Sequence, residues 1–240
     1  MNNAHLKGPQ TARIHSLFDS IAPEYDKLNH ILSLGVDRSW RRRALPWIID
    51  GEGPLSVLDV ACGTGDFSIG IARRSPDSVL VTGVDLSEGM LEVMRRKVCS
   101  ASLSSRISAE QGNCENLRFG DCSFDRATIA FGIRNFQDRE RALRELLRVL
   151  RPGGRLVILE LSVPSCRVLR WLYCLYFTRI LPWIGGKVSG DAAAYRYLPA
   201  SVLAFPGKDE WMAVMRSCGF SNVRHRAFTF GICRMYIGEK

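Results

Sequence analysis

The stretch Val57-Leu58-Asp59-Val60-Ala61-Cys62-Gly63-Thr64-Gly65-Asp66 decides the fold of this 240-residue chain. It starts as a short apolar run, passes through a turn with two glycines and leads into a helical pattern. A buried strand that enters a helix through a glycine turn is the first unit of an open α/β sheet. Ligands of such sheets bind beyond the carboxyl ends of the strands, so this turn is also the first candidate binding element.

The same alternation of apolar runs and helical patterns continues along the chain. Strands are predicted at residues 55–60, 79–84, 106–111, 124–131 and 156–161, and helices at 67–74, 88–98 and 139–150. Continuous apolar strands separated by helices indicate a parallel sheet that is covered on both faces. Gly231 divides 222–228 from 232–237, and this pattern predicts a closing antiparallel hairpin.

An acidic residue ends the second predicted strand. Asp85 follows Gly63 by 22 residues, close to the spacing of the carboxylate that binds ribose hydroxyls in nucleotide-binding sheets. The third glycine of the dinucleotide pattern is absent, because Ser68 stands there, and no Gly-Lys-Ser/Thr phosphate loop occurs. A ribose site without a pyrophosphate cradle favours S-adenosylmethionine, which carries no phosphate. A purely structural glycine turn is the alternative.

A polar turn follows the third predicted strand at Gly112-Asn113. The Asn113 side chain offers both a donor and an acceptor, which suits the polar edge of adenine. Asn and Gly are also ordinary turn residues, so a solvated turn remains an equal alternative.

Several segments resemble those of a known family, and the resemblance runs nearly end to end. The segments are Phe18–Asp26, Leu28-Asn29-His30, Phe131-Gly132-Ile133-Arg134-Asn135, Arg151–Arg155, Asp191, Ala194–Leu198 and Phe205-Pro206. The chain resembles the class I S-adenosylmethionine methyltransferases, and within them the membrane-quinone C-methyltransferases of menaquinone and ubiquinone biosynthesis. Arg151–Arg155 marks only the superfamily, whereas the other segments are more specific.

The resemblance implies that S-adenosylmethionine is held at Thr64, Asp85 and the Asn113-Cys114 pair. Together with the glycine turn, the candidate cofactor-binding residues are Gly63, Thr64, Gly65, Asp85, Asn113 and Cys114. The chain departs from common family residues at Ala61, Cys114 and Ala130. The first two substitutes are small, and Ala130 removes the serine that some relatives place near the cofactor.

The predicted fold class is α/β: a doubly wound, mostly parallel, seven-stranded Rossmann-like methyltransferase sheet with N-terminal helices and a C-terminal antiparallel hairpin. The length favours a single domain over residues 1–240. Within it we expect an N-terminal helical cap (1–50), a cofactor-binding core (51–161), a substrate- or membrane-facing helical insertion (162–207), and a closing helix and hairpin (208–240). A helix is expected over 168–183 and a loop around Tyr195 and Tyr197.

The implied reaction is methyl transfer to a ring carbon of demethylmenaquinol, giving menaquinol. The alternative acceptor is a polyprenyl methoxybenzoquinol of ubiquinone biosynthesis. Such a transfer needs a group that stabilises a phenolate and a base for the ring proton. Arg134 is the first catalytic candidate, with a surface salt bridge to Asp138 as its alternative. Further candidates are Tyr25, Asp26, His30, Asp191 and Tyr195, and the sequence indicates no metal site.

Two other classes of function were compared with this one. A nucleic-acid methyltransferase is disfavoured because neither Pro-Pro nor Pro-Cys, the dipeptides of the base-methylating motifs, occurs in the chain. A non-enzymatic nucleoside-binding module is the remaining alternative. Nucleic acid is therefore not expected as a partner.

The net charge of +9 is concentrated in one third of the chain. Residues 151–240 carry 13 basic and 5 acidic side chains, whereas residues 51–150 carry 13 and 14. Residues 161–190 combine basic and aromatic side chains without any acid, a pattern typical of interfacial helices. We therefore expect a polyprenylated hydroquinol as substrate and a cytoplasmic protein that associates peripherally with the anionic inner face of the cytoplasmic membrane. Core packing of the aromatic residues is the alternative, and a homodimer is left open.

Overall fold

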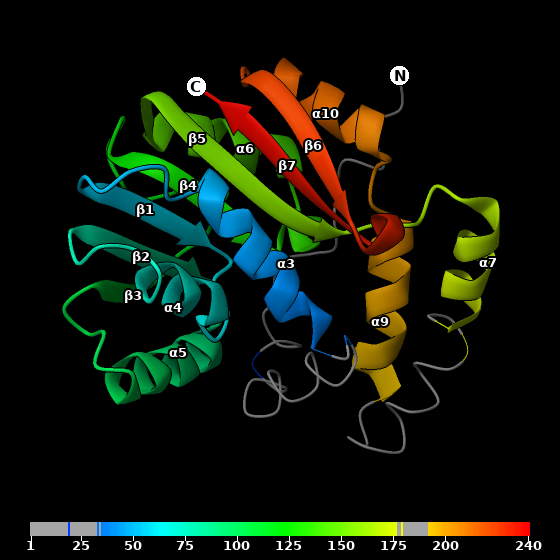
Figure 1. The fold of residues 1–240 in the computed structure, drawn as a ribbon, viewed down its shortest axis with the longest axis horizontal. Helices are drawn as coiled ribbons and strands as arrows, with labels where there is room; N and C mark the ends of the chain where they lie inside the picture. The colour runs from blue at the N-terminus through cyan, green and yellow to red at the C-terminus, as the bar shows by residue number, and fades with distance from the viewer. Residues whose placement is uncertain (1–18, 20–32, 34, 177–178, 180–191) are drawn as a thin grey trace.

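The computed structural model describes residues 19, 33, 35–176, 179 and 192–240, with 192–196 described by backbone alone. Seven strands form one sheet in the order β3-β2-β1-β4-β5-β7-β6 (Figure 1). Their bounds are β1 Leu55–Val60, β2 Val79–Asp85, β3 Ile107–Gln111, β4 Phe124–Ala130, β5 Leu150–Leu161, β6 Ser221–Phe228 and β7 Cys233–Glu239. Strand β7 runs antiparallel to both of its neighbours, and the remaining pairs are parallel. The predicted fold class is confirmed.

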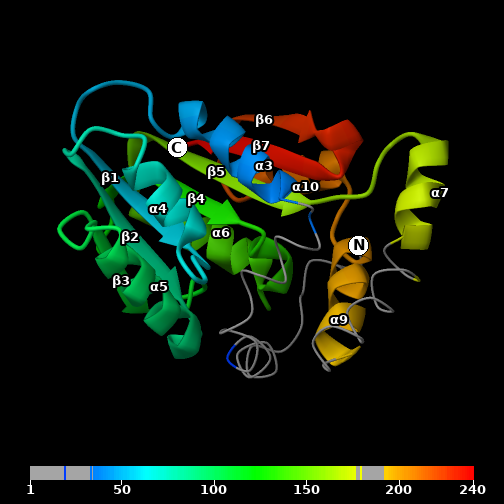
Figure 2. The ribbon, with the colours of Figure 1, turned by 60° about the horizontal axis from the view of Figure 1, so that its bottom comes forward.

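Helices cover both faces of the sheet. One face packs against α3 (Val36–Ala44), α4 (Asp66–Ala72) and α5 (Glu88–Ser100). The other packs against α6 (Arg139–Val149) and α10 (Lys208–Ser217), as the tilted view in Figure 2 also shows. The apolar side chains of the central strands lie in these two cores, which explains why their sequences read as continuous apolar runs.

Two parts of the chain differ from the sequence-based expectations. The region of Tyr195 and Tyr197 was expected to be a loop, but it forms the helix α9 (Ala192–Leu203). This prediction was wrong because the alanines of 192–194 favour a helix, and Pro199 is accommodated inside it. Within the N-terminal helical cap expected over 1–50, the helical stretch is divided into α3 and the short 3-10 helix η2 (Leu45–Trp47), with Pro46 in its first turn.

Helix α7 (Arg167–Leu175) stands apart from the sheet, at the end opposite α5 in Figures 1 and 2. It confirms the first half of the helix predicted over 168–183, and most of the second half lies outside the described residues. Among the described helices, none has the length and apolarity that crossing a membrane requires.

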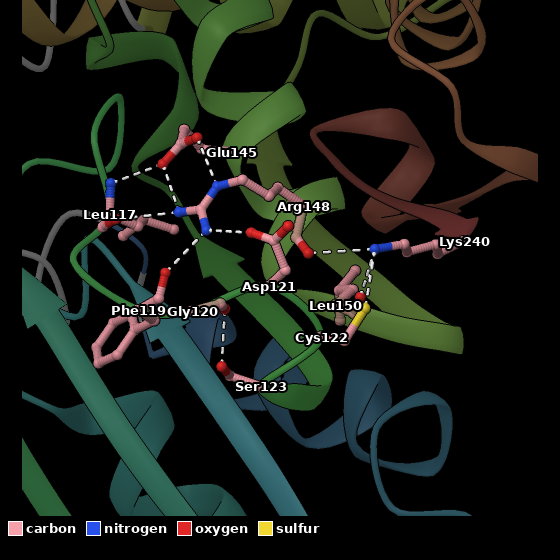
Figure 3. A network of polar contacts seen from close by, with 10 residues as sticks. All are labelled: Leu117, Phe119, Gly120, Asp121, Cys122, Ser123, Glu145, Arg148, Leu150 and Lys240. Carbon is pink, nitrogen blue, oxygen red and sulfur yellow. Dashed lines mark hydrogen bonds and ion pairs between the residues drawn. The ribbon is translucent and has the colours of Figure 1, made fainter.

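A polar network anchors the segment between β3 and β4 (Figure 3). The Arg148 guanidinium of α6 donates to the carbonyl oxygens of Leu117 and Phe119 and pairs with Asp121 at 2.8 Å. Glu145 pairs with Arg148 at 2.9 Å and accepts the Leu117 N–H. These bonds fix the end of the polar turn that follows β3.

Candidate active site

The carboxyl ends of β1 and β4 form the centre of the site. These strands are neighbours, and the chain order reverses between them, which is where open α/β sheets bind their ligands. Each strand is followed by a residue with left-handed backbone, Ala61 (φ 53°) and Phe131 (φ 64°). A Cβ on Gly132 would lie 2.6 Å from the Ala61 Cβ, so the two turns pack directly on each other.

The glycine turn leads directly into the start of α4. Gly65 precedes the helix with φ +81°, and no side chain caps the helix there. A Cβ at Gly65 would lie 2.5 Å from Met94 Cγ, so only glycine fits both the backbone and the space. Thr64 is buried, and its Oγ1 lies 3.4 Å from Lys97 Nζ.

A buried carboxyl braces this turn from behind. Asp59 accepts hydrogen bonds from Ser68 Oγ at 2.5 Å and Thr128 Oγ1 at 2.8 Å. Burial raises the pKa of Asp59 to about 6, and the two hydroxyl donors oppose that rise. The Ser68 hydroxyl therefore ties the first turn of α4 to β1, which gives a structural reason for serine where the dinucleotide pattern has glycine.

Asp85 lies at the end of β2, beside the glycine turn. Its Oδ2 accepts the Gly63 N–H at 2.8 Å and its Oδ1 accepts the Ser87 N–H at 3.0 Å. Burial raises the pKa of Asp85, while backbone donors, those of Ser87 and Gly63 first, lower it. Each carboxylate oxygen keeps a second lone pair, so the residue can still accept two ribose hydroxyls.

Asn113 lines a shallow hollow at the ends of β2 and β3. Asn113 Oδ1 accepts the Glu115 N–H at 2.8 Å, which leaves the amide nitrogen of its side chain as a donor. The hollow measures about 450 Å³ and is lined by Leu86, Gln111, Gly112, Asn113, Asn116 and Arg118. The Cys114 side chain instead packs in the core, where burial raises the pKa of its thiol. Cys114 can therefore meet a ligand only through its backbone.

Arg134 is buried, with 5% of its surface exposed, in the short helix η3 (Ile133–Asn135). Its Nη1 pairs with the fully buried Glu160 at 2.7 Å and donates to the Phe131 carbonyl, and its Nε donates to Ser201 Oγ. The alternative of a surface salt bridge with Asp138 is wrong, because Asp138 caps α6 instead.

The structure does not describe the side chains of the remaining catalytic candidates. Tyr25, Asp26, His30 and Asp191 lie outside the described residues, and Tyr195 is described by its backbone alone. They stay predictions.

Sequence reasoning missed two acids. Asp19 accepts hydrogen bonds from Ser87 Oγ and the Gly89 N–H, so it sits at the start of α5 close to Asp85. It belongs to the Phe18–Asp26 motif, which was a usable signal. Glu160 gave no signal of its own, because it reads as an ordinary residue near a strand end.

Comparison with known proteins decides the family. The profile of the ubiE/COQ5 methyltransferase family matches residues 6–240. The ubiquinone/menaquinone biosynthesis C-methyltransferase UbiE of Geobacter sulfurreducens is 53% identical over 228 residues, covering 95% of this chain and 88% of the relative. The demethylmenaquinone methyltransferase of Bacteroides fragilis is 44% identical, covering 97% of this chain and 94% of the relative.

The chain belongs to the ubiE/COQ5 methyltransferase family. It is an S-adenosylmethionine-dependent methyltransferase, as the resemblance in its motifs predicted. The residues fit this cofactor: Asp85 ends β2 beside the glycine turn, Gly65 is closely packed at the start of α4, and the sequence contains no phosphate loop.

Solved structures agree on the fold. An S-adenosylmethionine-dependent methyltransferase from Thermotoga maritima superposes with a TM-score of 0.64 at 21% identity, covering 94% of this chain and 99% of that chain. One from Aquifex aeolicus gives a TM-score of 0.61 at 17% identity, covering 83% and 88% of the two chains. At these identities the likeness concerns the fold alone.

Proposed function

We propose that this enzyme methylates a ring carbon of demethylmenaquinol, giving menaquinol. The proposal is carried by the similarity, over nearly the whole chain, to proteins named demethylmenaquinone methyltransferase. Besides the Bacteroides fragilis protein, that of Deinococcus radiodurans is 48% identical over 95% of this chain and 92% of its own length. The benzoquinol of ubiquinone biosynthesis is the second candidate, because other relatives carry both pathways in their names.

S-adenosylmethionine would supply the reactive methyl group, and the protein would hold and orient it. S-adenosylmethionine supplies a methyl group already activated on a sulfonium, so positioning provides much of the rate. We propose that Asp85 holds the ribose hydroxyls, that Gly63, Thr64 and Gly65 shape the space for the methionine portion, and that Asn113 and the Cys114 backbone border the adenine. Asp59 holds this turn in place from the core side.

The buried ion pair with Glu160 changes the role that we propose for Arg134. Arg134 and Glu160 together carry no net charge, so the pair polarises an acceptor hydroxyl less than a lone guanidinium does. We propose that Arg134 mainly holds the Phe131–Asn135 turn against the cofactor loop, with its direct action on a phenolate still a prediction. Tyr25 and Asp26 remain the proposed groups for handling the hydroquinol proton.

We also propose that the polyprenyl chain is drawn from a membrane surface by α7. The exposed side chains Val168, Trp171, Leu172 and Leu175 follow helical spacing and form one apolar stripe. A hollow of about 530 Å³ beside α7 is lined partly by Leu161, Val202 and Phe205, which suits an isoprenoid chain. We accordingly propose that the enzyme associates peripherally with the membrane and that the segment 162–207 faces it.

Acceptor identity can be tested directly. The purified enzyme is given S-adenosylmethionine with a short-chain demethylmenaquinol or the matching methoxybenzoquinol, and products are identified by mass. We expect a gain of one methyl on the naphthoquinol. Methylation of the benzoquinol alone would transfer the assignment to the second candidate, and methylation of neither would refute both.

Asp85→Ala serves as the variant that tests the cofactor site. Losing the hydrogen bonds to two hydroxyls should weaken S-adenosylmethionine binding roughly tenfold or more in calorimetry. Asp77→Ala, a nearly fully exposed acid before the opposite end of β2, is the control and should bind normally. Unchanged affinity in the Asp85 variant would remove this carboxylate from the site.

A further inference from the structure

A second, strongly basic hollow extends away from the candidate active site, and its lining residues Asp66 and Lys97 lie nearest to the glycine turn. It measures about 760 Å³ and opens between α3, α4 and α5. Its basic lining comes from α3, from α5 and from the two residues that follow α4: Arg38, Arg41, Arg42, Arg73, Arg74, Arg96 and Lys97. Among the described residues that line it, Asp66 alone is acidic.

The positive charge of this hollow is largely uncompensated. Asp66 is already paired with Lys97 at 2.5 Å and lies 3.8 Å from Arg41, which also pairs with Asp37. None of Arg38, Arg42, Arg73, Arg74 and Arg96 forms an ion pair with another described residue. Five exposed guanidinium groups therefore surround one concave space, where their potentials add.

The lining selects for phosphate. Guanidinium groups bind phosphate oxygens in a bidentate way, and several of them together match several linked phosphate groups. The volume falls in the range of small-molecule sites, roughly 300 to 1,000 Å³. Phe67 is the aromatic residue of the described lining, and it is 97% buried in the core, so nucleobases find no exposed ring to stack on.

The position of the hollow separates it from the two surfaces already assigned. Arg73 and Arg74 follow the last turn of α4, about 10 Å along the helix from the glycine turn at its start. S-adenosylmethionine has no phosphate and needs none of these arginines. Helix α7 lies at the opposite end of the sheet, and a concave hollow does not match a flat bilayer (Figures 1 and 2).

We infer that the hollow binds a soluble anion that carries two or more linked phosphate groups, of the class of organic di- and triphosphates. This site is distinct from the methyl-transfer site. It neither requires nor excludes the acceptor proposed above.

Inorganic tripolyphosphate is the probe, measured by titration calorimetry against the full-length enzyme. We expect saturable binding of one tripolyphosphate, at least about tenfold tighter than that of orthophosphate at equal ionic strength. Arg73→Ala/Arg74→Ala should weaken this binding about tenfold or more. The control is Arg141→Ala/Arg226→Ala, which removes the same charge from two exposed arginines on other elements and should change the affinity less than about threefold.

Thermal unfolding and S-adenosylmethionine affinity verify that both double variants fold. Equal weakening in the two variants would mean general attraction to a basic protein and would overturn the proposal. So would binding without saturation. The last experiment uses vesicles of phosphatidylcholine with phosphatidylglycerol. If vesicle binding depends on Arg73 and Arg74 while tripolyphosphate fails to bind, the hollow is a lipid-binding surface and the inference is wrong.

Discussion

Asp59 joins three elements through one buried carboxyl. It lies on β1 and accepts hydroxyl hydrogen bonds from α4 and β4, so the turn proposed to receive the cofactor is fixed from inside the core. Burial makes ionisation of this carboxyl costly, which is why its pKa is raised to about 6 even though the hydroxyl donors stabilise the ionised form. The rigidity of the turn is thus linked to the protonation of one residue.

This linkage predicts a pH-dependent stability. The folded protein holds the Asp59 proton more tightly than the unfolded chain, so the stability it provides is complete below pH 3.8 and is lost as the pH rises through about 6. Asp59→Asn keeps the shape and removes the titration. We expect the free energy of unfolding of the wild type, relative to that of the variant, to fall by up to about 3 kcal/mol across this window.

Urea denaturation at closely spaced pH values measures this difference, and the comparison cancels groups that titrate in both proteins. Asp77→Asn, in a nearly fully exposed residue, is the control and should follow the wild type. Parallel stability curves for the wild type and Asp59→Asn would show that Asp59 does not titrate in this range.

Arg134 and Glu160 form a buried ion pair, in which each charge compensates for the lost hydration of the other. Arg134→Met leaves Glu160 unpaired in the core, which should lower the free energy of unfolding by about 3–5 kcal/mol. Arg134→Met/Glu160→Gln removes both charges and should recover part of that loss. Denaturant unfolding measures both; a double variant no more stable than the single one would argue against the pair as the cause.

At the scale of elements, the segment after β3 depends on α6 for its position. Arg148 donates to two carbonyl oxygens and two carboxylates there, and the carboxylates of Glu145 and Asp121 raise its pKa (Figure 3). The Asn113-Cys114 turn belongs to the same connection between β3 and β4. A residue of α6 therefore helps to position the turn that we propose borders the adenine.

Arg148→Met should therefore make the segment between β3 and β4 less ordered and should weaken S-adenosylmethionine binding. Removing charge-assisted hydrogen bonds from a partly buried network should cost about 1–3 kcal/mol of unfolding free energy. S-adenosylmethionine affinity should fall several-fold, and hydrogen exchange at 113–121 should rise. Arg144→Met, whose ion pair with Glu140 lies on the same helix but is more exposed, is the control. Normal exchange in the Arg148 variant would contradict the anchoring role.

Element identity was largely predictable from sequence, because strands and helices here carry clear periodicity. The five parallel strands and the hairpin were found, since buried strands read as apolar runs and Gly231 marks the turn. Helix α9 was not predicted, because its two tyrosines and Pro199 are weak helix formers and conceal the helical preference of the alanines before them. Within the site, Asp85 could be placed by spacing, whereas Glu160 could not, because its partner Arg134 is 26 residues away and pairing depends on the sheet.

At the scale of the whole molecule, the distribution of charge along the chain does not predict its distribution on the surface. The excess positive charge lies in residues 151–240, whereas residues 51–150 are nearly neutral. Folding brings Arg38, Arg41 and Arg42, from residues 1–50 with a net charge of +2, beside Arg73, Arg74 and Arg96, from residues 51–150 with a net charge of −1. A basic hollow therefore forms although neither segment is strongly charged. Acids of 51–150 such as Glu145 and Asp121 form ion pairs elsewhere. Sequence sums cannot show this segregation.

The apolar stripe of α7 is the other whole-molecule feature, and it predicts how the enzyme meets a membrane. Trp171 is 64% exposed and central in the stripe, with Arg167 and Arg170 on the same helix. Trp171→Ser should weaken co-sedimentation with vesicles that contain phosphatidylglycerol roughly tenfold, because burial of one large apolar side chain contributes about 1.5–3 kcal/mol. Raising the salt should weaken the remaining binding further. Leu80→Ser, an exposed apolar residue on β2, should leave sedimentation unchanged. Equal sedimentation of the wild type and Trp171→Ser would show that α7 meets something other than lipid.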